Sequence, residues 1–176
     1  ENNNRTFKTL GVDVISFTPN WKIVKRLMLE ALIRKGDFCW HCHTGIFSYP
    51  MQMAIKFGTP LVIWGEPSSE YTAYYDYRDD EIEQVDETRF NRFINLGISS
   101  DDMKNMIESD TDLDPRDLVP YTYPKISELK RLRYNSICLG SFVKWDTKKQ
   151  AQVIQSELGW KGDEVEGMPK GLYDYE

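Results

Sequence analysis

The sequence predicts an α/β fold in which helices flank a parallel sheet. Two apolar runs, Val12–Phe17 and Leu61–Trp64, have the composition of strands. Between them lie two segments with helical patterns or helix-terminating residues, Trp21–Lys35 and Ser48–Phe57. A strand, two helices and a strand in this order are typical of βα wiring, in which the strands lie parallel.

The first predicted elements are a strand and a capped helix. Val12–Phe17 is rich in β-branched residues, which favour strands. Pro19 and Asn20 precede the helix, Asn20 as a suitable N-cap, and Gly36 is a suitable residue to end it. The apolar residues inside the helix repeat at helical spacing: Ile23, Val24, Leu27, Met28, Ala31 and Leu32.

A cysteine and histidine motif comes next, and we expect it to form a loop ahead of the second helix. Its residues are Cys39-Trp40-His41-Cys42-His43-Thr44-Gly45. Ser48 is a suitable N-cap for the helix that follows, with Pro50 near its first turn and Gly58 at its end.

The run Leu61–Trp64 is apolar without alternation, as expected for a strand that is buried on both faces. It ends in Gly65-Glu66. Ligands bind at the carboxyl ends of strands in open α/β sheets, so this end and the cysteine motif point to one crevice.

The rest of the chain alternates polar and apolar segments. We expect polar helices over 79–108 with a break at Leu96–Ser100, after which Ser99 or Ser100 caps a helix. The later expected elements are a loop over 110–120, a helix at 126–133 capped by Ser127, a strand at 136–143, and a helix at 147–158 between Asp146 and Gly159.

Composition bounds the class of protein. The 176 residues include 40% hydrophobic and 13% aromatic residues, which excludes an intrinsically disordered chain. No run approaches the roughly 18 apolar residues of a membrane span. The net charge of -6 argues against general nucleic-acid binding. Three cysteines are too few for a disulfide framework, so a cytoplasmic location is expected.

Acidic residues concentrate in one segment. Residues 76–117 hold 14 Asp or Glu and 5 Lys or Arg, whereas the rest of the chain is slightly basic. We interpret this segment as an acidic helical insertion within a single α/β domain that spans residues 1–176.

The cysteine motif offers metal ligands. Cys-x-x-Cys spacing lets two thiolates reach one metal ion, and Cys138 is the remaining cysteine. Cys39, Cys42 and Cys138 could therefore hold zinc or an iron–sulfur cluster. A ligand-lining role without metal, or buried cysteines beside hydrogen-bonding histidines, explains the motif equally well.

Several other residues are candidates for binding. A carboxylate after a strand-end glycine, as at Glu66, can hold magnesium or a ribose hydroxyl, and Glu70 lies close enough in sequence to help. Asp146 is either a helix cap or a site residue, and Lys148 in the next turn could pair with a phosphate. A tyrosine cluster could stack on a base or pack the insertion: Tyr71, Tyr74, Tyr75 and Tyr77.

These motifs, in this order, resemble the N-acetyl sugar amidotransferase family of bacterial surface-polysaccharide biosynthesis, within the ATP-pyrophosphatase or PP-loop superfamily. The segments that carry the resemblance are 4–20, 39–71, 118–124 and 140–167, with Ile46–Pro50, Ile63–Glu66, Trp145–Lys148 and Gly159–Gly167 the most characteristic. The resemblance implies a Rossmann-like, adenine nucleotide alpha hydrolase-like sheet.

The resemblance also implies a reaction. ATP would activate the amide oxygen of a sugar acetamido group, and ammonia would displace AMP to give an acetamidino group, in lipopolysaccharide (O-antigen) or nonulosonic-acid biosynthesis. Magnesium would assist. A glutaminase partner, with a cyclase-like channel subunit, would supply the ammonia. The superfamily's Ser-Gly-Gly-x-Asp-Ser loop does not occur in these residues, so we expect the chain to be an inactive central portion of a longer enzyme.

In this scheme the site residues have distinct roles. Trp64, Gly65, Glu66 and Glu70 would contact the nucleotide or magnesium. Glu66, Asp146 and Lys148 would be catalytic. The substrate would be lined by His41, His43, Thr44, Gly45 and Trp145.

Two alternatives remain open. Transfer-RNA thiolation enzymes of the same superfamily carry a Cys-x-x-Cys, a helix and a strand that ends in Gly-His, so a sulfurtransferase that uses Cys39, Cys42 and Cys138 is one. The other is a non-catalytic domain that docks through the acidic segment.

Overall fold

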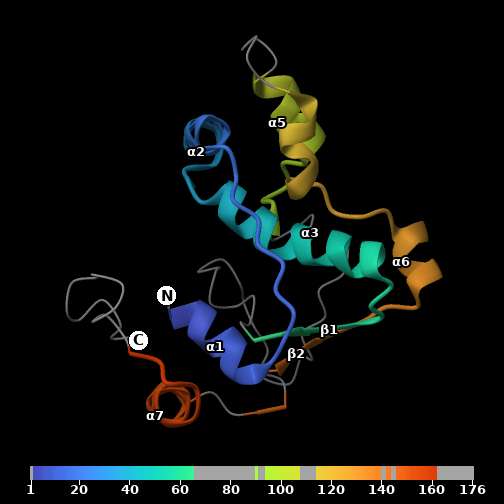
Figure 1. Cartoon of the computed structure of the whole chain (residues 1–176). Coiled ribbons are helices and arrows are strands. Elements are labelled where there is room, and N and C mark those ends of the chain that lie inside the picture. The colour runs from blue at the N-terminus through green and yellow to red at the C-terminus, as the bar shows by residue number, and fades with distance from the viewer. Residues whose placement is uncertain are drawn as a thin grey trace. The chain divides into compact units, whose positions relative to one another are not determined.

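The computed structural model describes residues 2–65, 90, 94–107, 114–139, 142–143 and 146–161. The chain divides into two compact units, one of residues 19–143 and one of residues 1–18 with 144–176. The described part is rich in helix and contains one small parallel sheet of two strands (Figure 1). The predicted mixture of helices with a parallel sheet is therefore confirmed at this coarse level. The single domain and the insertion over 76–117 stay predictions.

Helix α2 (Trp21–Lys35) in the larger unit begins and ends where its sequence predicts. Asn20 caps it, because its Oδ1 accepts a hydrogen bond of 3.1 Å from the backbone N of Lys22. Gly36 ends it at a φ of 69°, a conformation that glycine adopts without strain. The buried side of the helix carries Ile23, Val24, Leu27 and Ala31.

Helix α3 (Trp40–Phe57) begins well before the predicted N-cap, so the prediction of a loop at the cysteine motif is wrong. Ser48 does not cap a helix. Its Oγ lies 2.7 Å from the carbonyl oxygen of Thr44 and 2.6 Å from that of Pro120, and its single proton is shared between these acceptors. Pro50 therefore lies inside the helix, and Gly58 ends it as predicted.

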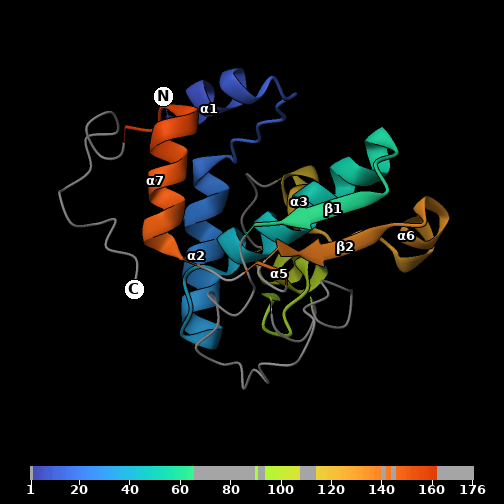
Figure 2. The same cartoon turned by 90° about the horizontal axis from the view of Figure 1, so that it is seen from below.

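Strand β1 (Leu61–Trp64) pairs in parallel with β2 (Asn135–Cys138), so that Leu61 lies opposite Asn135 and Trp64 opposite Cys138. Figure 2 shows the two strands side by side. The prediction that β1 is buried on both faces is wrong within the described residues. Leu61 and Ile63 share one face and are 48% and 56% exposed, whereas Trp64 on the other face is 8% exposed.

The predicted strand at Val12–Phe17, in the smaller unit, is absent, because these residues have no regular secondary structure. Their large side chains are exposed, with Val12 and Ile15 each at 51%. Strand propensity expresses how well a residue packs in a sheet, so β-branched residues do not form a strand without a partner strand. In the larger unit, the strand predicted over 136–143 is shorter than expected, because β2 ends at Cys138.

Three further elements complete the described part of the larger unit. Helix α5 (Ser100–Ile107) is capped by Ser99, which exchanges hydrogen bonds with Asp102, as predicted. A 3-10 helix, η3 (Pro115–Tyr121), takes the place of the second half of the predicted loop, whereas residues 110–113 lie outside the described residues. Helix α6 (Ile126–Leu132) begins at Lys125, whose backbone N donates to Glu128 at 3.3 Å, so the predicted cap at Ser127 is wrong.

Helix α3 is the central element of the larger unit (Figure 1). It contacts α2, η3, α6 and β1. Trp40 at its start belongs to one hydrophobic cluster, with residues of α2, α5 and η3. Phe47 and Met51 belong to a second cluster, with Trp64, Leu129 and Cys138. Because α3 contributes residues to both clusters, it fixes the position of the cysteine motif relative to the end of β1.

The smaller unit pairs two helices, α1 (Asn2–Leu10) and α7 (Thr147–Leu158). The guanidinium of Arg5 donates a hydrogen bond of 2.8 Å to the carbonyl oxygen of Gly159. Asp146 caps α7 by accepting from the backbone N of Lys149 at 3.0 Å, and Gly159 ends it, as predicted.

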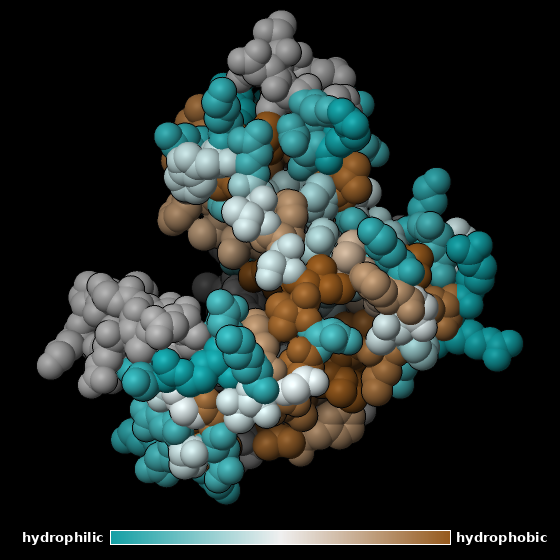
Figure 3. All heavy atoms as spheres, in the orientation of Figure 1, coloured by the Kyte–Doolittle hydropathy of each residue, from teal (hydrophilic) through white to brown (hydrophobic). Residues whose placement is uncertain are grey.

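Large hydrophobic side chains among the described residues of each unit are exposed, such as Val14 at 46% and Ile33 at 69%. Figure 3 shows hydrophobic side chains that reach the surface over a broad area of the face in view. No helix in the described ranges combines the length and apolar composition of a membrane span.

Candidate functional site

Two neighbouring parts of helix α3 hold the predicted site residues of the larger unit. We call Asp37–Gly45 the α3 entrance. We call the hollow beside the end of β1 the β1 cavity, and its lining residues are Ile46, Phe47, Pro50, Val62, Ile63, Trp64 and Gly65.

A carboxylate organises the α3 entrance. Oδ1 of Asp37 accepts a hydrogen bond of 2.7 Å from the backbone N of Cys39, and its Oδ2 lies 4.0 Å from Nδ1 of His43. The carbonyl oxygen of Cys39 accepts from the backbone N of Cys42 at 2.9 Å and from that of His43 at 3.1 Å. The two cysteines thus lie one turn apart at the start of the helix.

The pKa values of Cys39, His41 and His43 are shifted toward the neutral forms of these groups. Burial lowers the pKa of His41 and of His43, and the charge of Asp37 opposes the shift in each case. Burial raises the pKa of the Cys39 thiol, and Asp37 adds to this shift. At neutral pH the entrance therefore holds neutral imidazoles and a protonated Cys39.

The ring of Tyr121 from η3 closes the inner side of the entrance. A Cβ built on Gly45 would lie 3.3 Å from Cε1 of Tyr121, so glycine permits this close approach. Burial, Asp117 and Cys42, in this order, raise the pKa of Tyr121 to about 12. The hydroxyl groups of Tyr121 and Thr44 are buried and have no hydrogen-bond partner among the described residues.

The described residues do not gather the three thiols into a group that could hold a metal ion. Cys138 is 1% exposed and packs in the second hydrophobic cluster with Leu129. None of the three cysteines forms a disulfide. We therefore derive no chemical step through zinc or an iron–sulfur cluster.

The β1 cavity has a volume of about 390 Å³ and a predominantly apolar lining. Trp64 forms part of its wall, with its ring centroid 5.0 Å from that of Phe47 and its Nε1 donating to Oγ of Ser136 at 2.7 Å. Gly65 follows at the carboxyl end of the strand, and a Cβ added there would meet no atom of the described residues within 4 Å. This is the end at which the sequence predicts a ligand.

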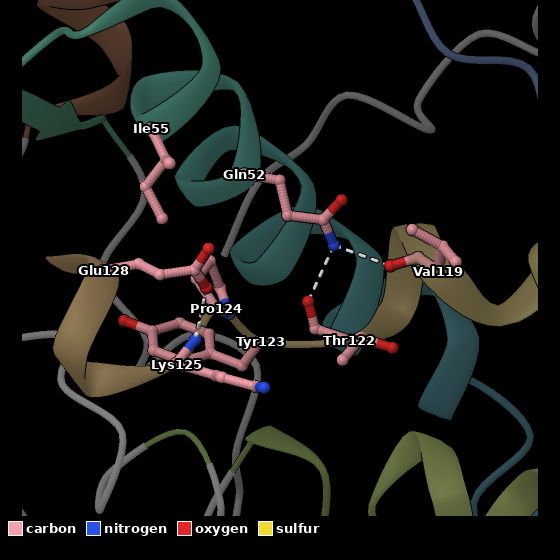
Figure 4. A pocket seen from close by; sticks show the side chains of 8 residues that line it. All are labelled: Gln52, Ile55, Val119, Thr122, Tyr123, Pro124, Lys125 and Glu128. Carbon is pink, nitrogen blue, oxygen red and sulfur yellow. Dashed lines mark hydrogen bonds between the residues drawn. The ribbon is translucent and has the colours of Figure 1, made fainter.

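A second cavity, of about 300 Å³, lies between α3, η3 and α6 (Figure 4). Nε2 of Gln52 donates to the carbonyl oxygens of Val119 and Thr122, each at 2.6 Å. Glu128 accepts from the backbone of Lys125. The sequence did not predict this cavity, because its walls come from segments that lie far apart in the chain. The one feature that pointed to it is the segment 118–124, which is among those that resemble the amidotransferase family.

The other predicted site residues are placed differently. Asp146 and Lys148 belong to the smaller unit, where both are exposed and Asp146 caps α7. Glu66, Glu70 and Trp145 lie outside the described residues, as do the four tyrosines of the cluster. The structure thus brings together the cysteine motif residues at one place and Trp64 with Gly65 at the other.

Comparison with known proteins found no protein-family model that matches the chain and no curated protein that matches it. The function proposed below therefore rests on the sequence and on the geometry of the site.

Proposed function

We propose that this chain is part of an ATP-dependent amidotransferase that converts a sugar acetamido group into an acetamidino group. The observation that carries the proposal is the β1 cavity at the carboxyl end of a parallel strand, beside Gly65. In open α/β sheets this is where nucleotides and their acceptors bind. The proposal includes a Rossmann-like sheet of which β1 and β2 form a part.

The residues of the cavity have the properties that such a reaction needs. Gly65 leaves the backbone open to a ligand, because no Cβ occupies the space at the strand end. Trp64 is held in place by its hydrogen bond to Ser136 and by Phe47, so it presents a fixed apolar wall. A wall of this kind excludes water, which would otherwise compete with ammonia for the activated amide.

The chemistry requires activation because an amide carbonyl is a poor electrophile. Transfer of the adenylyl group of ATP to the amide oxygen, with release of pyrophosphate, gives a good leaving group. Ammonia then adds to the amide carbon, and AMP leaves with that oxygen. Positioning and charge stabilisation would supply most of the rate.

The co-substrates, partners and further site residues of the proposed reaction are those that the sequence predicts. ATP and magnesium are the co-substrates, and Glu66 and Glu70 remain the candidate ligands. A glutaminase, with a cyclase-like channel subunit, supplies ammonia in the cytoplasm, and the product serves lipopolysaccharide (O-antigen) or nonulosonic-acid biosynthesis. Asp146, Lys148 and Trp145 remain candidates for the sugar or a phosphate, and His41 and His43 for lining the substrate.

The two alternatives gain no specific support. A sulfurtransferase that uses all three cysteines requires access to Cys138, which is buried in a hydrophobic cluster. A docking role for the acidic segment concerns residues that lie mostly outside the described part of the chain.

The test is mass spectrometry of the products formed by the protein that contains this chain, given ATP, magnesium, ammonium and acetamido sugars. A product in which NH replaces one oxygen, together with stoichiometric AMP, is the expected result. If no AMP forms with any acceptor, the proposed chemistry is wrong. AMP without the amidine would instead favour sulfur transfer.

A substitution connects this activity to the cavity. Gly65→Ala adds a methyl group to open space, so we expect unchanged stability and a fall in kcat/KM of about tenfold or more, because small displacements of a bound reactant are costly. Leu61→Val, four residues earlier in strand β1 and not part of the cavity lining, is the matched control and keeps full activity. Equal activity of Gly65→Ala and wild type would remove the cavity from the mechanism.

A further inference from the structure

We propose that Cys39 and Cys42 form a reversible disulfide, and that the α3 entrance exchanges thiols with a second, disulfide-containing molecule. This inference does not depend on the amidotransferase proposal. It concerns only the start of helix α3 and the residues packed against it.

The geometry of the helix start permits the bond. Cys39 is the N-cap residue of α3 and Cys42 lies three residues later in its first turn. The hydrogen bond of 2.9 Å from the backbone N of Cys42 to the carbonyl oxygen of Cys39 closes this turn. Side chains three residues apart on a helix have Cβ atoms about 5–6 Å apart, and a modest rotation of the N-cap residue brings this to the range of a disulfide.

Access distinguishes the three cysteines. Cys42 is exposed, Cys39 is half-buried and Cys138 is buried. An incoming disulfide can therefore reach Cys42 first, and Cys39 is placed to resolve the resulting mixed disulfide from within the same turn. Cys138 takes no part, since it is packed in the second hydrophobic cluster.

A second, independent observation concerns two buried hydroxyl groups at the α3 entrance. Tyr121 is only 3% exposed and Thr44 is fully buried, and the hydroxyl groups of both are buried without a hydrogen-bond partner among the described residues. Tyr121 is also close enough to Cys42 to interact with its charge. A buried donor without a partner is uncommon and costs stability, and we infer that this hydroxyl finds a partner when the neighbouring, exposed Cys42 changes its state.

The exchange is balanced in two steps. The thiol of Cys42 loses its proton, and its sulfur attacks one sulfur of R–S–S–R, so that a mixed disulfide forms, the S–S bond breaks and RS⁻ leaves and takes up a proton as RSH. The thiol of Cys39 then loses its proton, and its sulfur attacks the sulfur of Cys42, closes the Cys39–Cys42 bond and displaces the second RS⁻, which is also protonated to RSH. The two cysteines are oxidised by two electrons, and the incoming disulfide is reduced by the same two.

The experiment is thiol mapping of the chain after equilibration with oxidised glutathione, using alkylation and peptide mass spectrometry. We expect a Cys39–Cys42 bridge that dithiothreitol reverses, while Cys138 is alkylated only after unfolding. Cys39→Ser should stop at a mixed disulfide with glutathione on Cys42. Cys42→Ser should react with glutathione at Cys39 at least about tenfold more slowly than Cys39→Ser reacts at Cys42, because Cys39 is less accessible and burial raises the pKa of its thiol.

Cys138→Ser is the matched control and should behave as the wild type does. The proposal is overturned if the wild type accumulates separate glutathione adducts on Cys39 and Cys42 without a bridge. It is also overturned if both thiols stay reduced in oxidised glutathione, or if bound zinc, released in stoichiometric amount on alkylation, accounts for their protection.

Discussion

At the scale of single residues, Tyr121 defines the inner wall of the α3 entrance. Its ring contacts Gly45, its centroid lies 6.0 Å from that of Trp40, and its hydroxyl is buried without a partner among the described residues. The ring therefore supplies packing, whereas the hydroxyl makes no hydrogen bond to the described part of the chain.

Removing that hydroxyl should not weaken the fold. We expect Tyr121→Phe to leave the free energy of unfolding at pH 7 unchanged or to raise it by about 1 kcal/mol, because the penalty for burying an unpaired donor disappears. Urea unfolding followed by tryptophan fluorescence measures this. A loss of more than about 1 kcal/mol would mean that the hydroxyl has a partner in solution.

The same variant has a pH signature. The pKa of Tyr121 is raised to about 12 in the folded protein, above the usual value of 10.0, so the unfolded chain loses this proton first as pH rises. The contribution of Tyr121 to stability is complete below pH 10 and is lost between pH 10 and 12. The wild type should therefore lose more stability over this range than Tyr121→Phe does.

The residue composition of the site was partly predictable. The Cys-x-x-Cys spacing brings Cys39, His41, Cys42 and His43 together at one place in the structure, since a short motif stays local in any fold. The contact between Gly45 and Tyr121 could not be predicted, because 76 positions of chain separate them and only tertiary packing joins them.

At the scale of helices and strands, Asp146 has two candidate roles, as the N-cap of α7 and as a catalytic residue, and substitutions can separate them. Asp146→Asn keeps an oxygen that can cap α7, so stability should hold, whereas Asp146→Ala should destabilise by about 1 kcal/mol. If the carboxylate is catalytic, the activity of the complete protein should fall in both variants. The free energy of unfolding is measured for both variants alongside their activity. Full activity of Asp146→Asn would mean that Asp146 only caps the helix and is not catalytic.

Elements with local signals were predicted well. The capped helices α2 and α7, the Ser99 cap of α5 and the strand β1 each carry their signals within a few residues. The failures are elements whose outcome depends on distant chain. Ser48 has the chemistry of an N-cap, but Pro120 of η3 supplies an acceptor for its hydroxyl, and the helix extends through it.

At the scale of the whole molecule, the sheet presents one covered and one uncovered face. Val62 and Trp64 face the second hydrophobic cluster, whereas Leu61 and Ile63 are exposed within the described structure. Parallel sheets are normally covered on both faces. Two substitutions on β1 test whether the face that carries Leu61 and Ile63 is in contact with water in solution.

Ile63→Thr and Val62→Thr form a matched pair. We expect Ile63→Thr to change the free energy of unfolding by no more than about 0.5 kcal/mol, because its side chain is already in contact with water. Val62→Thr should cost about 1 kcal/mol or more, because it places a hydroxyl beside the cluster. Equal costs in chemical unfolding would show that the second face is covered too.

The proline inside α3 has a consequence for ligand recognition. Pro50 has no backbone N–H, so the carbonyl oxygen of Ile46 one turn earlier lacks the hydrogen bond that a regular helix would give it. Both residues line the β1 cavity. We expect this carbonyl oxygen to give the mainly apolar cavity one hydrogen-bond acceptor, and the N–H of the acetamido group in the proposed reaction is a donor that would satisfy it.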